Sequence, residues 1–335
     1  MKKNLSLLIF SLILIFLLLE SCFRLFYPIN TQSYYGEVID RDQNFIALKK
    51  NHIHKVDRWN NEYYASYTFG DYRNRVTQKI NNEKRKILIL GDSFTFGLYL
   101  KDKDTYVNKL QNNFKNFNLV NSSTPGWGLK DYYLFAKKFC KIIKPKKIII
   151  ILNDGDLGRI EKKVIKNDTD KISLKEKYKL YKFMIENFMV VSFLRNNLDK
   201  FLNNNNNLPK KEFEGTNIQF EPNIAKQIVK DAKKLFIELN KTATNCGASL
   251  HVIKLGWNDN KDNQEIIYDP QLIFFKKNSN FFEDNSIYFY DNTLNLLDVH
   301  ENKQKYIIKN EGHPNELGAD EIFNSLKIHF NKILI

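Results

Sequence analysis

Short apolar runs separated by helix-like segments are the feature that most limits the folds open to this chain. The runs occupy 86–90 (KILIL), 117–121 (FNLVN), 146–154 (KKIIIILND), 249–256 (SLHVIKLG) and 286–291 (SIYFYD). The segments between and after them carry apolar residues at helical spacing, at 106–114, 129–143, 224–239 and 317–334. Strands that alternate with helices form a parallel sheet with helices on both faces. We therefore expect an α/β fold with a central parallel five-stranded sheet.

Residues at the ends of these segments support the helix boundaries. Asp104 precedes the first helical pattern and is the expected N-cap. The second helix should end near Pro145, and Gly247 should close the long third one. Pro314 and Asn315 open the last helix.

About 65 residues, roughly 157–221, interrupt the alternation between the third strand and the long helix. A capping box, Ser173-x-x-Glu176, begins an apolar stretch that we interpret as a helical insert, and Asn203–Asn207 forms its exit loop. One interpretation of the insert is a subdomain that only packs against the rest of the domain. The other is a lid or acceptor-binding wall over the site. A membrane-facing surface is a further alternative, because the insert holds Phe183, Met184, Phe188, Met189 and Phe193.

The N-terminal segment, 1–28, has the composition of an export signal. Lys2 and Lys3 precede Leu5–Leu19, which carries no charge. No small-x-small cleavage site follows, which favours an uncleaved membrane anchor with the rest of the chain on the extracytoplasmic side. A cleaved signal peptide and a lipoprotein modified at Cys22 are the alternatives. Residues 29–83 are expected to be an extended lead-in to the main domain, 84–335.

The formal net charge of +14 is not organised as a nucleic-acid-binding surface. Lysines occur in every segment, and no basic stripe with interleaved aromatic residues is visible. We therefore expect no nucleic-acid partner.

The cysteines and two of the histidines give no sign of a metal site. Cys22, Cys140 and Cys246 are odd in number and far apart, so no disulfide framework or metal motif can be recognised. We expect Cys140 and Cys246 to be small buried apolar residues. His52 and His54 are expected in a solvent-exposed loop.

The first apolar run leads into ILILGDSFTFG, 87–97, in which Ser93 follows the strand directly. In an open parallel sheet the ligand crevice lies at the carboxyl ends of the strands, so this serine is delivered into it. Gly91 gives the backbone room to turn. Ser93 is either the cap of the next helix or a nucleophile, and its position alone does not decide between them.

Three other segments, at strand ends or before the last helix, are expected to bring polar groups to the same crevice. Gly126 follows the second strand, Asn153 ends the third, and His313 precedes the last helix. A backbone N–H and a side-chain amide directed at one point form an oxyanion hole. Together with a serine and a histidine, they form the arrangement that acyl transfer needs.

These residues resemble the four sequence blocks of the SGNH hydrolases, also called the GDSL lipase/esterase family. GDSFTFG, NSSTPG, LNDGD and GHPNELG occur in the family's order, and the resemblance covers 84–335 apart from the insert. It implies a flavodoxin-like three-layer α/β/α sandwich and no cofactor or metal. It also implies that Ser93 is the nucleophile, that His313 is the general base, and that the Ser93 N–H, the Gly126 N–H and the Asn153 side chain form the oxyanion hole. Asp92 and Asp154 would be structural neighbours of these groups.

The chain departs from the family in the acid that partners the histidine. The family usually has Asp three residues before the histidine, and here that residue is Asn310. Glu311, two residues before it, is our candidate for the acid. Asn310 or a backbone carbonyl as orienting group, and an inactive site, are the alternatives. Asp298 and His300 form a similar pair, but the helix-opening pattern does not follow them.

The sequence thus predicts a membrane-anchored, extracytoplasmic serine esterase. Its substrate would be an ester-linked acyl group, such as acetyl, on a carbohydrate or lipid. The alternatives are a polysaccharide O-acyltransferase that uses the same acyl-serine, and a non-catalytic glycan-binding relative.

Overall fold

The computed structural model describes residues 2–26, 39–42, 45–59, 63–76, 80–161, 188, 190–191, 194, 221–257, 269–278, 280–309 and 311–334. The chain divides into two compact units, Met1–Tyr34 with Lys163–Lys211, and Tyr35–Lys162 with Glu212–Ile335. We describe each unit by itself. The predicted capping box, the Asn203–Asn207 loop and most of the predicted insert lie outside the described residues.

Among its described residues, the first unit contains the long apolar helix α1 (Lys2–Phe26). Its Ser6–Phe23 window is long and apolar enough to cross a membrane. A signal sequence near an N-terminus can have the same length and composition. Most described leucine and isoleucine side chains of α1 are exposed. Glu20 is different, because its carboxylate is buried and accepts a hydrogen bond of 3.1 Å from the Val190 N–H. The Phe16 and Phe188 rings meet edge to face at 5.4 Å.

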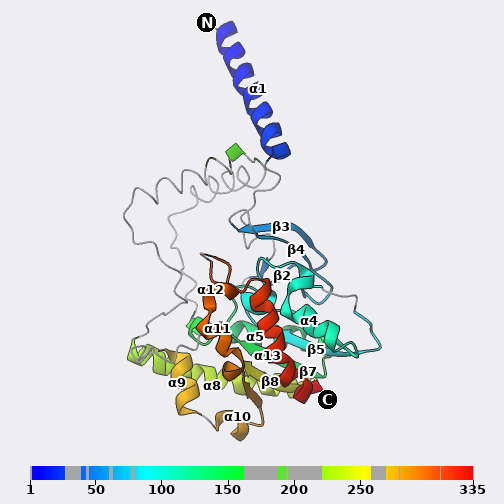
Figure 1. The fold of residues 1–335 in the computed structure, drawn as a ribbon, viewed down its shortest axis with the longest axis vertical. Helices are drawn as coiled ribbons and strands as arrows, with labels where there is room; N and C mark the ends of the chain where they lie inside the picture. The colour runs from blue at the N-terminus through cyan, green and yellow to red at the C-terminus, as the bar shows by residue number, and fades with distance from the viewer. Residues whose placement is uncertain are drawn as a thin grey trace. The chain divides into compact units, whose positions relative to one another are not determined.

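The second unit is built on a parallel five-stranded sheet (Figure 1). Its strands are β5 (Arg85–Leu90), β6 (Phe117–Asn121), β7 (Lys147–Leu152), β8 (Ser249–Lys254) and β9 (Tyr288–Asp291). The spatial order is β6-β5-β7-β8-β9, and every neighbouring pair is parallel. This is the strand order of doubly wound, flavodoxin-like sheets. The predicted fold class is confirmed.

Alternate residues of each strand face two different cores. Leu88, Ile150 and Val252 belong to the core beneath α5 (Leu129–Ile143) and α8 (Pro222–Asn245). Ile89, Ile151 and Ile253 belong to the core beneath α4 (Tyr106–Asn113) and α13 (Glu316–Leu334). Because both faces of the strands are buried, the strands are continuous apolar runs instead of alternating ones.

Helix boundaries agree with the sequence except at α4. The N-cap is Thr105, whose hydroxyl accepts from the Asn108 N–H, and not Asp104 as predicted. Asp104 instead ends a short 3₁₀ turn, Asp102–Asp104. Four shorter helices were not predicted: α9 (Pro270–Lys277), α10 (Phe281–Asp284), α11 (Leu297–Glu301) and α12 (Lys303–Tyr306).

The lead-in is folded into two antiparallel hairpins, β1 (Ile39–Asp42) with β2 (Phe45–Leu48) and β3 (Ile53–Trp59) with β4 (Tyr63–Thr68). The expectation that His52 and His54 lie in an exposed loop is wrong for His54, which lies in β3, while His52 precedes β3 and is half-buried. His54 pairs with Tyr67 within the β3–β4 ladder, and the ring of His52 stacks on Phe69. The β3–β4 hairpin packs against Phe96 and Leu98 in a small apolar core.

Arg75 fastens this lead-in to the loop that follows β5. Its buried guanidinium donates to the carbonyls of Phe96 and Gly97, each at 2.7 Å, and to Leu100. It also pairs with Asp102 at 2.7 Å. A planar group with five donors can satisfy several carbonyls at once, which a lysine cannot do with the same geometry.

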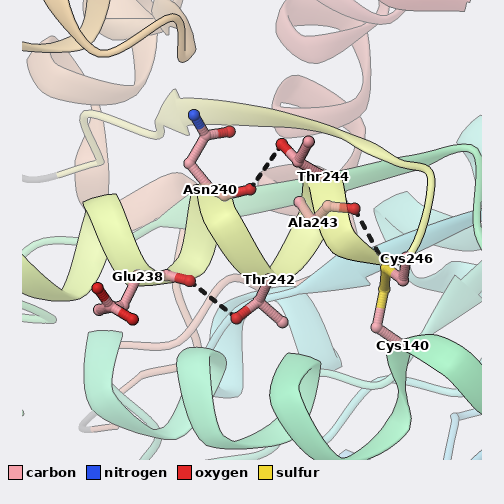
Figure 2. The surroundings of a disulfide bond; sticks show 7 residues. All are labelled: Cys140, Glu238, Asn240, Thr242, Ala243, Thr244 and Cys246. Atoms are coloured by element: carbon pink, nitrogen blue, oxygen red, sulfur yellow. Dashed lines mark hydrogen bonds between the residues drawn. A yellow bond between two sulfur atoms is a disulfide. The ribbon is translucent and has the colours of Figure 1, made fainter.

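A disulfide joins Cys140 at the end of α5 to Cys246 at the end of α8 (Figure 2). The expectation of two separate small apolar residues is therefore wrong, although Cys140 is buried. The sequence could not pair them because they are 106 positions apart and follow no spacing motif. The fold brings their Cα atoms to 6.1 Å, a normal distance for a disulfide. The bond closes a large loop around the segment predicted as the insert.

Replacing both cysteines, Cys140→Ala with Cys246→Ala, should lower the free energy of unfolding by about 2–5 kcal/mol, because a disulfide across a long loop restricts the unfolded chain. We would measure urea unfolding with and without reductant. Reductant should destabilise the wild type and leave the double variant unchanged. Cys22→Ser is the matched control, because Cys22 is free and exposed. Free thiols at 140 and 246 in the oxidised wild type would contradict the bond.

Candidate active site

The loop after β5 presents Ser93 at the start of α3 (Ser93–Phe96). Asp92 is the N-cap of this helix, and its Oδ1 accepts from the Phe94 N–H at 2.9 Å. The capping role that Ser93 could have filled thus belongs to its neighbour. Gly91 is required by space, since a Cβ there would lie 2.2 Å from the Thr95 hydroxyl oxygen. The Ser93 hydroxyl is therefore left to other partners.

His313 reaches Ser93 from the loop before α13. Its Nε2 lies 2.6 Å from Ser93 Oγ, although the two residues are 220 positions apart. The loop is closed by hydrogen bonds from the Ile308 N–H to the His313 carbonyl, 2.8 Å, and from the Gly312 N–H to the Ile308 carbonyl, 3.1 Å. This fixed backbone limits the positions that the imidazole can take.

Glu311 holds the other side of the imidazole. Its Oε1 lies 2.5 Å from His313 Nδ1, and its Oε2 accepts from the His313 N–H at 2.9 Å. A carboxylate on Nδ1 favours the tautomer that carries its proton there, which leaves Nε2 to accept the Ser93 proton. Between them, Gly312 has φ +91°, a left-handed conformation that glycine adopts readily, and the Glu311 side chain reaches forward two residues to His313.

The candidate oxyanion residues Gly126 and Asn153 lie on two loops that are hydrogen-bonded to the end of β5 or to the loop that contains Ser93, which we call the serine loop. After β6, the Ser122 N–H donates to the Ile89 carbonyl and the Thr124 N–H to the Gly91 carbonyl, at 3.0 and 3.2 Å. This brings the loop that contains Gly126 beside the end of β5. Asn153 follows β7 directly, and its Nδ2 donates to Asp92 Oδ2 at 3.2 Å.

A buried ionic cluster, Asp92, Asp156 and Arg159, lies next to these groups. Arg159 Nη1 is 3.0 Å from an oxygen of each carboxylate, and both carboxylates are fully buried. The other Asp156 oxygen accepts from the Tyr132 hydroxyl at 2.7 Å and the Asn153 N–H at 2.9 Å. Two loops and helix α5 thus share one set of charges.

The charges of this cluster perturb one another. Burial, and then the negative charge of Asp92, raise the pKa of Asp156 well above its ordinary value, and the Arg159 guanidinium opposes them. Burial also raises the pKa of Tyr132 well above its usual range, so that its hydroxyl stays protonated and donates to Asp156. A single cation therefore stabilises two buried carboxylates.

Sequence reasoning missed Asp156 and Arg159. It named Asp154, together with Asp92, as a structural neighbour of the catalytic groups, but the acid that shares Arg159 with Asp92 is Asp156. The third strand reads on as NDGDLGR, and an arginine seven residues beyond a strand end gives no signal without knowledge of the turn between them.

Aromatic rings border the histidine. The Phe94 ring lies 5.0 Å from the imidazole and packs edge to face on Trp257, while Tyr99 lies 6.4 Å from His313 on another side. Trp257, which is fully buried, follows β8. These rings restrict water around the imidazole and give an acyl group an apolar surface.

The other sequence candidates stay apart from Ser93. Asp298 accepts from the Tyr306 hydroxyl and from Asn302, and His300 Nε2 contacts the Gly256 carbonyl at 2.7 Å. Asn310 lies outside the described residues. No cluster of metal-ligating side chains occurs among the residues that the structure describes.

Comparison with known proteins gives similarity of fold. No protein-family model matches the sequence. No curated protein matches it. Solved structures do match, including a psychrotrophic esterase of Pseudoalteromonas, with 15% identity over 75% of this chain and 99% of that one and a TM-score of 0.46. A lipolytic protein of the G-D-S-L family from Veillonella parvula has 12% identity over 74% and 98% of the two chains and a TM-score of 0.43. The chain is similar in fold to GDSL-family lipolytic proteins. Identities and TM-scores this low assign no residue role and no substrate, which must come from the site itself.

Substituting Gly312→Ala should slow ester hydrolysis, because φ +91° strains any other residue and the loop would relax away from the Glu311–His313 contact. Gly247→Ala is the matched control, with φ +77° and, as at Gly312, open space around the added methyl. Both variants should lose about 1 kcal/mol of stability, but only Gly312→Ala should lose turnover. Equal turnover in the two variants would contradict a role for this backbone conformation in the site.

Proposed function

We propose that this chain is a serine esterase of the SGNH, or GDSL, family, which hydrolyses carboxylic esters through an acyl-serine intermediate. The observation that carries the proposal is the continuous contact from Ser93 Oγ to His313 Nε2, 2.6 Å, and from His313 Nδ1 to Glu311, 2.5 Å. A hydroxyl, a base and an acid in series are what a serine nucleophile requires. The four sequence blocks, which supply residues from separate strand ends, support the family assignment.

In the proposed reaction, Ser93 Oγ attacks the ester carbonyl while His313 Nε2 takes its proton. The negative charge that forms on the carbonyl oxygen is stabilised by the Ser93 N–H, the Gly126 N–H and Asn153 Nδ2. The C–O bond to the alcohol then breaks, and His313 returns the proton to the leaving oxygen. Water, deprotonated by the same imidazole, releases the acid and restores the serine.

Glu311 stabilises the imidazolium that exists during both steps. Its carboxylate side chain is only 9% exposed, so water screens its charge weakly. We propose that it takes the role that the family usually gives to an aspartate one position earlier. This supports a catalytic site over the non-catalytic glycan-binding alternative, which depended on the missing aspartate.

The proposed substrate is an acyl ester, such as an acetyl ester, of a carbohydrate or lipid in the cell envelope. A polysaccharide O-acyltransferase would share the first half of the reaction and differ only in the acceptor. Hydrolysis is the simpler proposal, because it needs no acceptor site beyond the groups already described.

We further propose that α1 anchors the chain in a membrane, with the catalytic unit on the extracytoplasmic side. The apolar Ser6–Phe23 window and the preceding Lys2 and Lys3 support this orientation. The disulfide between Cys140 and Cys246 supports it independently, because structural disulfides persist in oxidising compartments.

The first test is hydrolysis of a short p-nitrophenyl ester by the full chain in detergent, beside Ser93→Ala. Wild-type turnover should be sustained, and the variant should lose it by at least about 1000-fold, because the acyl-serine cannot form. A fluorophosphonate probe should label the wild type alone. A burst of one equivalent without turnover would favour the transferase. Turnover that survives in Ser93→Ala would refute the proposed function.

Two substitutions then test the acid. Glu311→Gln should lower kcat by about 100-fold or more, because a neutral amide stabilises the imidazolium poorly and can hold the wrong tautomer. Asn310→Asp, the matched variant at the family's usual position, should leave kcat within a few-fold of wild type. If Glu311→Gln keeps full activity, or Asn310→Asp raises activity strongly, the assignment of Glu311 is wrong.

A further inference from the structure

Arg159 connects three of the four loops that carry the candidate catalytic groups, those of Ser93, Gly126 and Asn153. Its Nη1 contacts Asp92 Oδ2 on the serine loop, Asp156 Oδ1 on the loop after β7, and the Trp127 carbonyl beside Gly126, at 3.0, 3.0 and 2.8 Å. All three contacts use the same nitrogen. A cation at this one point therefore affects all three loops.

Asn153 is the oxyanion candidate whose side-chain orientation depends on this cluster. Its N–H donates to Asp156, and its carbonyl accepts from Gln271 at 3.1 Å, so its backbone is fixed from both sides. Its side chain has a single anchor, Nδ2 to Asp92 Oδ2. The side-chain oxygen, Oδ1, is buried and has no hydrogen-bond partner among the described residues.

The charge on Asp92 decides which end of this amide faces it. An ionised carboxylate only accepts hydrogen bonds, so the amide must turn its NH₂ group toward it. One N–H then bonds Asp92, and the second remains as a donor for a substrate oxyanion.

We propose that Arg159 is a positioning residue for the oxyanion hole, which holds Asp92 Oδ2 in place and thereby fixes the Asn153 amide with its second N–H directed at the substrate. This inference rests on the proposed esterase function and adds a determinant of its rate. Arg159 does not touch substrate in it and acts through two other residues.

The surroundings explain why one cation is decisive. The ionisable groups near Asp92 are Asp156, Arg159, Tyr132 and Tyr106, and among them Arg159 alone is positive. Two fully buried carboxylates without a cation favour uptake of a proton by one of them. Loss of Arg159 would therefore change the hydrogen bonding of Asn153 while Ser93, His313 and Glu311 stay in contact.

The test compares steady-state kinetics of Arg159→Gln and Arg159→Lys with wild type between pH 5 and 9. The neutral glutamine should lower kcat by on the order of 100-fold, the effect of losing one oxyanion donor, with KM within about threefold. Its acid limb should move to higher pH by at least about one unit, because the variant lacks the guanidinium that opposes the raised pKa of Asp156, the acceptor of the Asn153 N–H. Lysine, which restores a point charge, should recover kcat to within about fivefold of wild type and restore the pH profile.

Lys109→Met is the matched control. It removes another ion pair, Lys109–Asp320 at 2.6 Å, between α4 and α13. It should leave kcat and its pH profile unchanged. If Arg159→Gln yields no folded protein, the same comparison is made in Asp156→Asn/Arg159→Gln, which leaves one buried carboxylate instead of two.

A double-mutant cycle separates positioning from general support of the fold. Asn153→Ala removes the donor itself, so adding Arg159→Gln to it should lower kcat by no more than about threefold further. The inference would be overturned if the kcat losses of Asn153→Ala and Arg159→Gln multiply in the double variant. It would also be overturned if Arg159→Gln acts mainly by raising KM, or if Arg159→Lys is as slow as Arg159→Gln. Ser93→Ala measured in parallel distinguishes the failures, since turnover that survives in Ser93→Ala refutes the esterase, while wild-type-like kinetics of Arg159→Gln refute only the role of Arg159.

Discussion

The carboxylate of Asp92 is the interaction on which the candidate site depends. One oxygen caps α3 and so sets the position of Ser93, while the other accepts from Asn153 and Arg159. It is fully buried, so leaving it without partners would cost far more than a surface charge would. The loops at the strand ends are therefore held together by charge interactions as well as by the hydrogen bonds of the sheet.

Much of the second unit could be predicted because strand and helix leave separate marks on the sequence. All five strands of the sheet and their parallel arrangement follow from apolar runs that alternate with helical patterns. Ser93 and His313 could be selected because strand ends in such a sheet converge at one edge. The contact between Glu311 and His313 was also within reach, since the two are near neighbours in the chain.

What the sequence could not reveal depends on distant pairing. Cys140 and Cys246 meet only because α5 and α8 lie on the same face of the sheet, and no spacing rule connects positions so far apart. Arg159 reaches Asp92 across a turn whose path is set by the Asp156 contacts. Similarly, Thr105 displaces Asp104 as the cap of α4 because Asp104 is taken up in a 3₁₀ turn. Each of these outcomes depends on which groups the assembled fold brings into contact.

The separation of Ser93 and His313 by 220 positions has a consequence for synthesis of the chain. The serine emerges early, but its proposed base belongs to the loop before the final helix. Contacts between such distant residues form late, after the loop between them has closed. A growing chain thus carries an unactivated hydroxyl until its last segment has docked, and its chemistry begins only once the whole sheet is complete.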